Sequence, residues 1–427
     1  MLELSYIRNN RSVVKQGLMK RNWQPENLVI VDEIIQLDDT RKENQTRLDS
    51  LSADLNRISK EIGDLYKKGE TDQAGVLKQQ VPELKQQIKL LEKALNSVKI
   101  ELETKLLDLP NTPHEWVPAG NSEEDNFVYK AWEGKMPELS SDAIPHWELA
   151  DKYNLFNFKL GVKLTGAGFP VYRGQGARLE RALINFFLDE AMEAGYVEYH
   201  LPLLVNADSA KATGQLPDKE GQMYHVTKDD LYLIPTAEVP ITNIFRNDIV
   251  DKNDFPIKLT GYTPCFRREA GSYGAHVKGL NRVHQFDKVE IVQIQHPEKS
   301  WESLDHMIQH VENILVKLEL PYRILRLCGG DLGFTSAMTY DFEVFSAAQK
   351  KWLEVSSVSN FLTFQSNRLK LRYRDDKGKT QLVHTLNGSA LALARIVAAL
   401  LENNQMDAGI RIPKALVKYT GFEFIQV

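Results

Sequence analysis

The chain has 427 residues, of which 42% are hydrophobic and 26% are charged. A chain of this length has room for two or three domains with a large core, and its composition is that of a globular protein, which excludes a disordered or fibrous chain. The net charge of -5 gives no sign of nucleic-acid binding through bulk positive charge, so any such contact must use a local surface.

The two cysteines, Cys265 and Cys328, lie far apart and form no Cys-x-x-Cys pair. We therefore expect neither a disulfide framework nor a structural zinc site. The segment after Met1 lacks a basic region followed by an apolar run, and no stretch approaches the roughly 18 apolar residues that a membrane helix needs. These features predict a cytoplasmic protein that makes no use of a membrane.

Two heptad-like segments predict an antiparallel coiled-coil arm. Apolar residues recur every three or four positions over residues 34–65, with polar interruptions such as Arg41, and again over residues 77–102. A polar break at residues 68–72 allows the two helices to fold back on each other. At about 1.5 Å per residue, each helix would be about 45 Å long. Heptads alone do not exclude a scaffolding or intersubunit coiled coil, and the mixed charges are typical of a solvated face.

A proline-containing segment ends the second of these helices. Pro110 and Pro113 lack the amide donor that a helix interior requires and restrict the residues before them. We therefore divide the chain into an N-terminal helical domain, residues 1–110, whose arm covers about residues 30–103, and a second domain, residues 111–427.

The second domain has the pattern of a mixed α/β body. Its sequence pattern predicts helices at residues 178–193, 301–318 and 390–401, a buried strand at residues 231–234 and another strand at residues 351–357.

Residues 260–293 predict two antiparallel strands joined by a long glycine-containing connection. The first strand would cover residues 262–269 and the second residues 284–292. Because side chains alternate along a strand, Arg267 and Glu269 would share one face of the first strand. Three side chains would share a face of the second: Phe286, Lys288 and Glu290. Such a face combines cations, carboxylates and an aromatic ring, although a surface sheet with ion pairs is the alternative.

The helix predicted at residues 390–401 is apolar on nearly all sides except at Arg395. A helix of that kind is buried, and an unpaired buried guanidinium costs several kcal/mol. Arg395 therefore requires an anionic partner. A structural carboxylate is the commoner partner, and a bound phosphate would serve as well.

Taken together, these segments resemble the bacterial-type seryl-tRNA synthetases, of the class II aminoacyl-tRNA synthetase family, over essentially the whole chain. Residues 266–272 with 282–286 resemble class II motif 2, and residues 387–395 resemble motif 3. Residues 178–202 are similar to motif 1. Two further segments are more particular to the seryl branch: residues 110–115 and 236–238.

The resemblance implies an α+β fold, with a class II catalytic domain built on an antiparallel β-sheet and the coiled-coil arm at the N-terminus. It implies a homodimer, because motif 1 forms the subunit interface in this class. It also implies ATP-dependent activation of L-serine to seryl-adenylate and transfer to the 3′ end of serine tRNA, with charging of selenocysteine tRNA left open. The arm would reach the tRNA by shape and backbone contacts.

The resemblance also assigns roles to individual residues. Arg267 would hold the α-phosphate and Arg395 the γ-phosphate, each as a planar fork, and these two are the candidate catalytic residues. Phe286 would stack on the adenine, whose edge Glu269 would contact. The candidate ATP site comprises Arg267, Arg268, Glu269, Val283, Phe286, Glu354, Val355, Ser356, Ser357 and Arg395. The candidate serine site comprises Thr236, Ala237, Glu238, Arg267, Glu290, Asn387 and Ser389. Glu354 and Ser357 match the Mg²⁺-binding pair of the family.

Two departures from the family pattern concern the tRNA contact. Arg268 stands where many relatives have serine, and the loop at residues 273–278 lacks the arginine-rich run that many have. That loop meets the tRNA acceptor end in the family, so the departures leave the adenylate chemistry untouched.

Two other functions fit parts of the sequence. A synthetase-like ligase that loads an amino acid onto a carrier protein would share the catalytic motifs, but such paralogues lack the arm. A non-catalytic coiled-coil RNA-binding protein would need the arm but would have no use for Arg267, Glu269, Glu354 and Arg395.

Overall fold

The computed structural model describes residues 1–269 and 278–426. The chain divides into two compact units, one of Met1–Met19 with Trp23–Pro110 and the other of Lys20–Asn22 with Asn111–Val427. Residues 270–277, which carry part of the predicted motif 2 and its loop, lie outside the described residues. The predictions made for them stay predictions.

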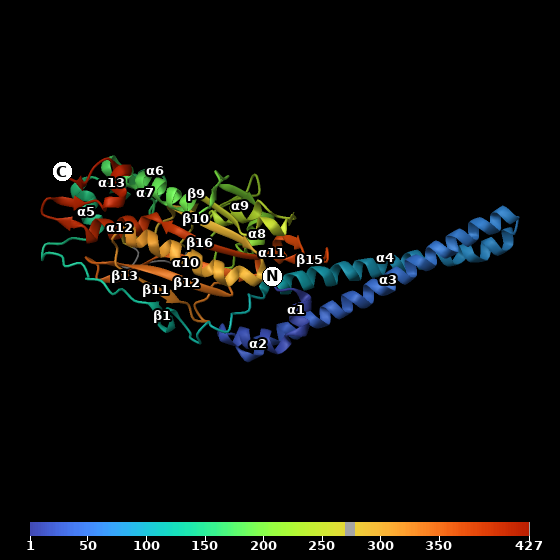
Figure 1. Ribbon diagram of the computed structural model, residues 1–427. Coiled ribbons are helices and arrows are strands. Elements are labelled where there is room, and N and C mark those ends of the chain that lie inside the picture. Colours follow the sequence, from blue (N-terminus) through green and yellow to red (C-terminus); the bar gives the residue numbers. More distant parts are fainter. Residues whose placement is uncertain (270–277, 427) are drawn as a thin grey trace. The chain divides into compact units, whose positions relative to one another are not determined.

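The first unit is helical (Figure 1). Its elements are α1 (Leu4–Asn9), α2 (Arg11–Lys20), the 3-10 turn η1 (Pro25–Leu28), α3 (Val29–Lys68) and α4 (Thr71–Asp108). Gly69 ends α3 with a φ of 80°, a left-handed conformation that glycine adopts without steric cost. The next helix begins two residues later, and α3 packs along α4. The predicted helical hairpin with a turn at residues 68–72 is confirmed.

The polar interruption at Arg41 has a structural reason. Asp38, on α3, is 2% exposed and accepts ion pairs at 2.8 Å from both Arg41 and Arg8 of α1. Burial alone would raise the pKa of this carboxyl, but hydrogen bonds from Lys42, Arg41 and Arg8 outweigh it and lower the pKa to about 2. Where α1 meets α3, an ion-pair cluster therefore takes the place of the apolar contacts of the heptad pattern.

The second unit is built on an eight-stranded sheet with the order β1-β11-β12-β13-β16-β10-β9-β4. Its neighbours pair antiparallel except for β4, which is parallel to β9. The strands are β1 (Phe127–Lys130), β4 (Val197–Glu198), β9 (Ile257–Phe266), β10 (Gln285–Gln295), β11 (Tyr322–Arg326), β12 (Met338–Ser346), β13 (Lys351–Leu362) and β16 (His384–Ala392). The fold is therefore α+β with an antiparallel sheet, as predicted.

Helices and short strands surround this sheet. The helices are α5 (His146–Tyr153), α6 (Phe158–Leu164), α7 (Gly174–Glu193), α8 (Ala207–Thr213), α9 (Glu238–Asn243), α10 (Ser300–Lys317), α11 (Phe364–Leu369), α12 (Leu393–Asn403) and α13 (Lys414–Thr420). The 3-10 turns are η2 (Glu123–Asp125), η3 (Lys252–Asp254), η5 (Gly279–Asn281) and η6 (Pro297–Lys299). The remaining strands are β2 (Phe156–Asn157), β3 (Val171–Tyr172), β5 (Leu204–Asn206), β6 (His225–Val226), β7 (Leu231–Leu233), β8 (Ile249–Val250), β14 (Arg372–Arg374), β15 (Thr380–Leu382), β17 (Gln405–Met406), β18 (Gly409–Arg411) and β19 (Phe424–Ile425).

The main core of this unit lies between the sheet and its covering helices (Figure 1). Apolar residues of α7, α10 and α12 pack there against the central strands. The predicted helices at residues 178–193 and 301–318 correspond to α7 and α10, and the predicted strand at residues 351–357 is the first half of β13.

Arg21 binds residues 20–22 to the second unit. Its guanidinium donates hydrogen bonds to the carbonyl oxygens of Asn111 at 2.7 Å, Leu332 at 2.8 Å and Ser336 at 2.5 Å. Burial lowers the pKa of Arg21 to about 9. Carbonyl oxygens rather than a carboxylate stabilise this buried cation.

Two predicted boundaries are wrong. The strand expected at residues 262–269 ends at Phe266, because the amide of Arg268 turns away to donate to the carbonyl of Gln222 at 3.0 Å. Glu269 has a φ of 46°, so it does not share a strand face with Arg267. The helix expected from residue 390 begins at Leu393, because β16 continues to Ala392, which pairs with Lys288.

Within residues 1–269 and 278–426, no helix is both long and apolar enough to cross a membrane.

Candidate active site

One face of the central sheet carries several of the predicted site residues. Gly388 of β16 faces α10, because a Cβ there would lie 3.4 Å from the side chain of Met307. Its neighbours Asn387 and Ser389 therefore point to the opposite face. Ser389 pairs directly with Glu290 of β10, so these polar side chains project from the same face of the sheet.

Hydrogen bonds join the predicted serine-site residues around Glu290, which is 1% exposed. The hydroxyl of Thr236 donates to Glu290 Oε2 at 3.0 Å, and the amide of Asn387 donates to Oε1 at 3.3 Å. The backbone amide of Glu238 donates to the hydroxyl of Thr236 at 3.2 Å. Four of the predicted residues are thus brought together, from the start of α9, the segment before it and two adjacent strands.

Lys288 and Gln365 belong to this cluster but were not assigned to the site from sequence. Lys288, buried on β10, pairs with Glu290 at 2.5 Å. Gln365, on α11, donates to Glu238 at 2.7 Å and accepts from the hydroxyl of Thr385 at 2.7 Å. Because side chains alternate along β10, the sequence predicted Lys288 on the same face as Glu290. Its place in the site could therefore have been predicted. Gln365 is 127 residues from Glu238, and no local pattern points to it.

Glu238 has a strongly perturbed acidity. Burial, with the nearby Glu290 carboxylate adding to it, raises the pKa of Glu238 to about 7, although the hydrogen bond from Gln365 opposes the shift. Two carboxylates in a low-dielectric pocket disfavour a second negative charge. Because Lys288 already pairs with Glu290, ionisation of Glu238 would add a negative charge to the cluster, which a cationic ligand group could offset.

Arg267 and Phe286 lie beside this pocket at the end of the β9–β10 hairpin. The guanidinium carbon of Arg267 is 5.3 Å from the centroid of the Phe286 ring, and its Nε donates to the carbonyl of Pro235 at 3.4 Å. Glu269 pairs with Arg282 at 3.0 Å. A cation and an aromatic face side by side suit a phosphate attached to a planar base.

A β-bulge brings Glu354 and Ser357 to one face of β13. Glu354 lies opposite Glu343 of β12 and Ser357 lies opposite Asp341, so three steps on β13 match two on β12. Without the extra residue, positions three apart on a strand would point to opposite faces. The bulge therefore allows this pair to act on a common ligand.

Asp341 is a third oxygen-bearing side chain at this place, and sequence reasoning missed it. It accepts a hydrogen bond of 2.6 Å from Ser357 Oγ. Burial, and secondly the Glu354 carboxylate, hold the pKa of Asp341 well above its usual range. Carboxylate and hydroxyl oxygens are ligands that Mg²⁺ accepts, and Mg²⁺ is commonly held by one or two carboxylates plus substrate phosphates. Glu354 and Ser357 fit such an ion.

Arg395 extends from the first turn of α12 toward β13. Its Nη1 donates to the carbonyl oxygen of Glu354 at 2.7 Å and lies 3.7 Å from the Glu354 carboxylate. Its Nε donates to the carbonyl of Asn281 at 2.9 Å. The Glu354 carboxylate is therefore the anionic partner that the sequence led us to expect. The Arg395 side chain is 26% exposed, so part of it still meets solvent.

The remaining predicted ATP-site and serine-site residues contribute little through their side chains. Val283 and Val355 are buried in the core, and Ala237 has no polar side-chain atoms, so any ligand contact would use their backbone. Ser356 donates to the carbonyl of Ser389 at 2.6 Å and so links β13 to β16. The side chain of Arg268 is exposed.

Comparisons with known families agree with this geometry. Residues 1–113 match the seryl-tRNA synthetase N-terminal domain, and residues 223–404 match the tRNA synthetase class II core domain (G, H, P, S and T).

Individual relatives match over the full length of the chain. A serine–tRNA ligase of Salinibacter ruber is 49% identical over 424 residues, which is 99% of this chain and 98% of that one. A serine–tRNA ligase of Chlorobaculum parvum is 45% identical over 429 residues, with 100% of both chains covered. The crystal structure of seryl-tRNA synthetase from Pyrococcus horikoshii complexed with ATP is 36% identical, with a TM-score of 0.90 over 100% of this chain and 99% of that one.

Proposed function

The chain belongs to the seryl-tRNA synthetase family and acts as a serine–tRNA ligase, and we propose that the sheet face around Glu290 and Arg267 is where it joins serine to ATP. The observation that carries this proposal is the buried cluster of Thr236, Glu238 and Glu290 next to the Arg267–Phe286 pair. A cation-binding pocket adjoins a phosphate- and base-binding surface, which is what an amino acid and ATP require.

In the first half-reaction, a carboxylate oxygen of serine attacks the α-phosphorus of ATP, and the bond to the leaving pyrophosphate breaks. Negative charge builds on phosphoryl oxygens, so the reaction gains from fixed cations more than from a proton carrier. Arg267 would hold the α-phosphate, and Arg395 the γ-phosphate. Magnesium bound by Glu354 and Ser357 would add positive charge at the phosphates. Asp341 would orient the Ser357 hydroxyl.

In the second half-reaction, a terminal ribose hydroxyl of the tRNA attacks the acyl carbon and AMP leaves. We propose that serine tRNA is bound through the arm formed by α3 and α4, which would read backbone and shape. Charging of selenocysteine tRNA is a second substrate to be tested. We further propose that the chain acts as a homodimer in the cytoplasm, in keeping with its family.

Serine would be recognised by the carboxylates of the cluster. Its ammonium group would pair with Glu238 and Glu290, and its hydroxyl would exchange hydrogen bonds with polar groups of the same cluster. Thr236 and Ser389 are the candidate partners. A site that hydrogen-bonds a substrate hydroxyl rejects analogues that lack it, because its buried polar groups are then left unpaired. Alanine should therefore be a poor substrate.

The proposal is tested by amino-acid-dependent exchange of pyrophosphate into ATP, measured with each of the twenty amino acids. We expect serine to support the fastest exchange. Absence of exchange with serine, or faster exchange with another amino acid, would refute the proposal. A ligase acting on a carrier protein would exchange pyrophosphate but leave serine tRNA uncharged.

The acidity of Glu238 predicts a pH-dependent affinity for serine. The pKa of about 7 means that the carboxyl is mostly protonated at pH 6 and mostly ionised at pH 8, and only the ionised form pairs with an ammonium group. The KM for serine should therefore fall about tenfold from pH 6 to pH 8. Steady-state exchange over this range measures it.

The control for this prediction is Glu238→Gln. The neutral amide keeps the shape of the side chain but does not titrate, so the KM for serine should be higher and almost independent of pH. If the variant keeps the tenfold slope, another group titrates and the role of Glu238 is wrong.

A further inference from the structure

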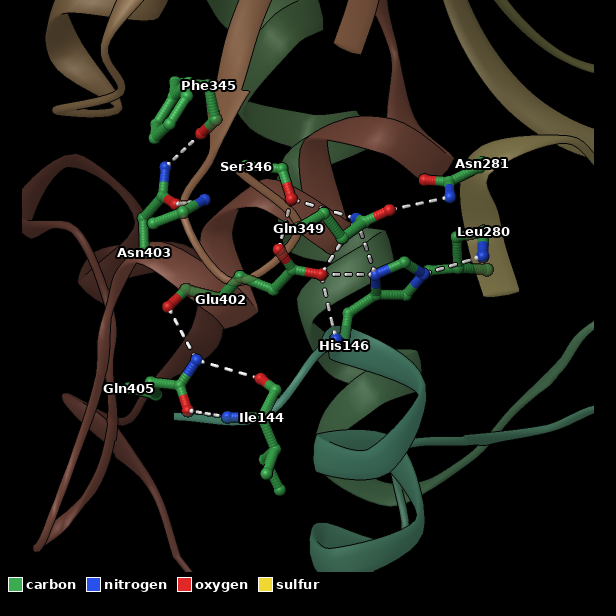
Figure 2. Close-up of polar contacts among 11 residues, drawn as sticks. Ile144, His146, Leu280, Asn281, Phe345, Ser346, Gln349, Glu402, Asn403 and Gln405 are labelled. Atoms are coloured by element: carbon green, nitrogen blue, oxygen red, sulfur yellow. Dashed lines mark hydrogen bonds and ion pairs between the residues drawn. The ribbon is translucent and has the colours of Figure 1, made fainter. Parts of the chain in front are cut away.

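A buried hydrogen-bond network joins α12 to α5, η5 and the end of β12 (Figure 2). Its centre is Glu402, near the end of α12. The carboxylate accepts hydrogen bonds from His146 Nδ1 at 2.7 Å, from the His146 amide at 3.0 Å and from Gln349 Nε2 at 3.0 Å, and also one from Ser346 Oγ. Both His146 and Glu402 are 0% exposed, so neither reaches a substrate.

The contacts of His146 define its tautomer. The amide of Leu280 donates to His146 Nε2 at 2.9 Å, which makes Nε2 an acceptor and leaves the proton on Nδ1, facing Glu402. Burial raises the pKa of Glu402, but the hydrogen bonds from His146 and Ser346 outweigh it and lower the pKa overall. An ionised carboxylate and a neutral imidazole therefore hold the backbone of η5.

The turn is shaped to receive this imidazole. Gly279 has a φ of 66°, and a Cβ there would lie 2.2 Å from His146 Nε2. Any other residue would be strained and would push the ring away from Leu280. The third residue of the turn, Asn281, donates from Nδ2 to Gln349 Oε1 at 2.9 Å, and Gln349 in turn donates to Glu402. Two chains of hydrogen bonds thus connect Glu402 to η5, one through His146 and one through Gln349.

Both chains of hydrogen bonds end at Arg395. The carbonyl of Asn281 accepts the Arg395 Nε bond, and the carbonyl of Glu354 accepts the Nη1 bond. Among residues 1–269 and 278–426, no hydrogen bond engages Nη2. A guanidinium fixed at Nε and Nη1 by two carbonyls can present its Nη2 edge to an anion in one orientation.

We propose that Gln349 is a positioning residue for ATP activation. With Glu402 and His146, it holds the carbonyl of Asn281 so that Arg395 meets the polyphosphate of ATP. This inference rests on the proposed role of Arg395. Pre-formed orientation lowers the reorganisation that catalysis would otherwise require.

The test is a double-mutant cycle of Gln349→Leu and Arg395→Ala, read as kcat/KM for ATP in serine-dependent exchange. We expect Gln349→Leu to lower this constant about tenfold and Arg395→Ala about 10³-fold, with KM for serine nearly unchanged in Gln349→Leu. The double variant should be no worse than Arg395→Ala within about twofold, because a lost orientation has no effect without the guanidinium.

Two variants guard against a general loss of structure. Asn281→Ala removes the amide that donates to Gln349 but leaves every donor to the Glu402 carboxylate in place. It should reproduce the tenfold loss. Gln405→Leu is the matched control: Gln405 also bonds the α12 end, but its partners are Ile144 and the carbonyl of Glu402, and it does not reach η5. It should change kcat/KM for ATP by less than about twofold.

Equal tenfold losses from Gln349→Leu with and without Arg395, or equal losses from Gln349→Leu and Gln405→Leu, would overturn the positioning role while leaving the proposed function intact. Wild-type protein without serine-dependent exchange would overturn the proposed function itself, and the positioning role with it.

Discussion

Replacement of Arg267 by alanine is expected to lower kcat/KM for serine-dependent pyrophosphate exchange by about 10³-fold. Arg267 lies over Phe286 and beside the serine cluster, so its guanidinium is placed to meet the α-phosphate where serine would attack. Removing one fixed donor from a developing phosphoryl charge typically costs about 3–4 kcal/mol. Exchange kinetics at saturating serine measure the loss.

The chain offers a matched control for this prediction. Arg326 also lies over an aromatic ring, with its guanidinium carbon 4.9 Å from the centroid of Phe127 at the β1 edge of the sheet. Arg326→Ala should leave exchange within about twofold. Arg267→Lys keeps the charge but loses the planar fork, so we expect an intermediate loss. A loss below tenfold in Arg267→Ala would contradict the assigned role.

The parts of the site that lie on one hairpin could be predicted from sequence. The alternation along residues 285–290 placed Phe286, Lys288 and Glu290 on one face, and the structure confirms β9 and β10 as an antiparallel pair. Alternation failed at Glu269, because the strand ends earlier and the backbone there is left-handed. Side chains alternate between the two faces only as far as the strand stays paired with its neighbour.

Other contacts depend on tertiary structure that no local pattern encodes. Simple alternation places Glu354 and Ser357 on opposite faces, and only the bulge against β12 reverses this. Glu402 and His146 are 256 residues apart, and each alone resembles an ordinary core residue. Gln365 likewise becomes informative only once α11 is placed against Glu238.

The polar residues of this unit therefore form two groups with different tasks. Glu290, Glu238 and Arg267 line the surface that would meet substrates, whereas Glu402 and Gln349 would act through Arg395. A buried ionised group is costly unless its hydrogen bonds are satisfied, and Glu402 accepts four. With its hydrogen bonds satisfied, Glu402 can help to hold the η5 backbone that binds Arg395.

Shortening the arm is expected to separate the two half-reactions. Deletion of residues 46–66 and 72–92 removes 21 residues, or three heptads, from each helix and keeps the turn around Gly69. The deletion also keeps the base of the hairpin, including the Arg8–Asp38 pair and the Lys105–Glu33 pair at 2.9 Å. Each remaining helix would be about 30 Å shorter, with its heptad register unchanged.

Serine-dependent exchange should stay within about threefold of wild type in this variant, because every candidate ATP and serine residue belongs to the second unit. Charging of serine tRNA should fall by at least about 10³-fold if the arm binds the tRNA as proposed, by shape and backbone contacts along its length. Aminoacylation of a serine tRNA transcript, run beside the exchange assay, measures both. Equal losses in the two assays would mean that the arm supports the catalytic unit itself, and unchanged charging would mean that the tRNA is bound elsewhere.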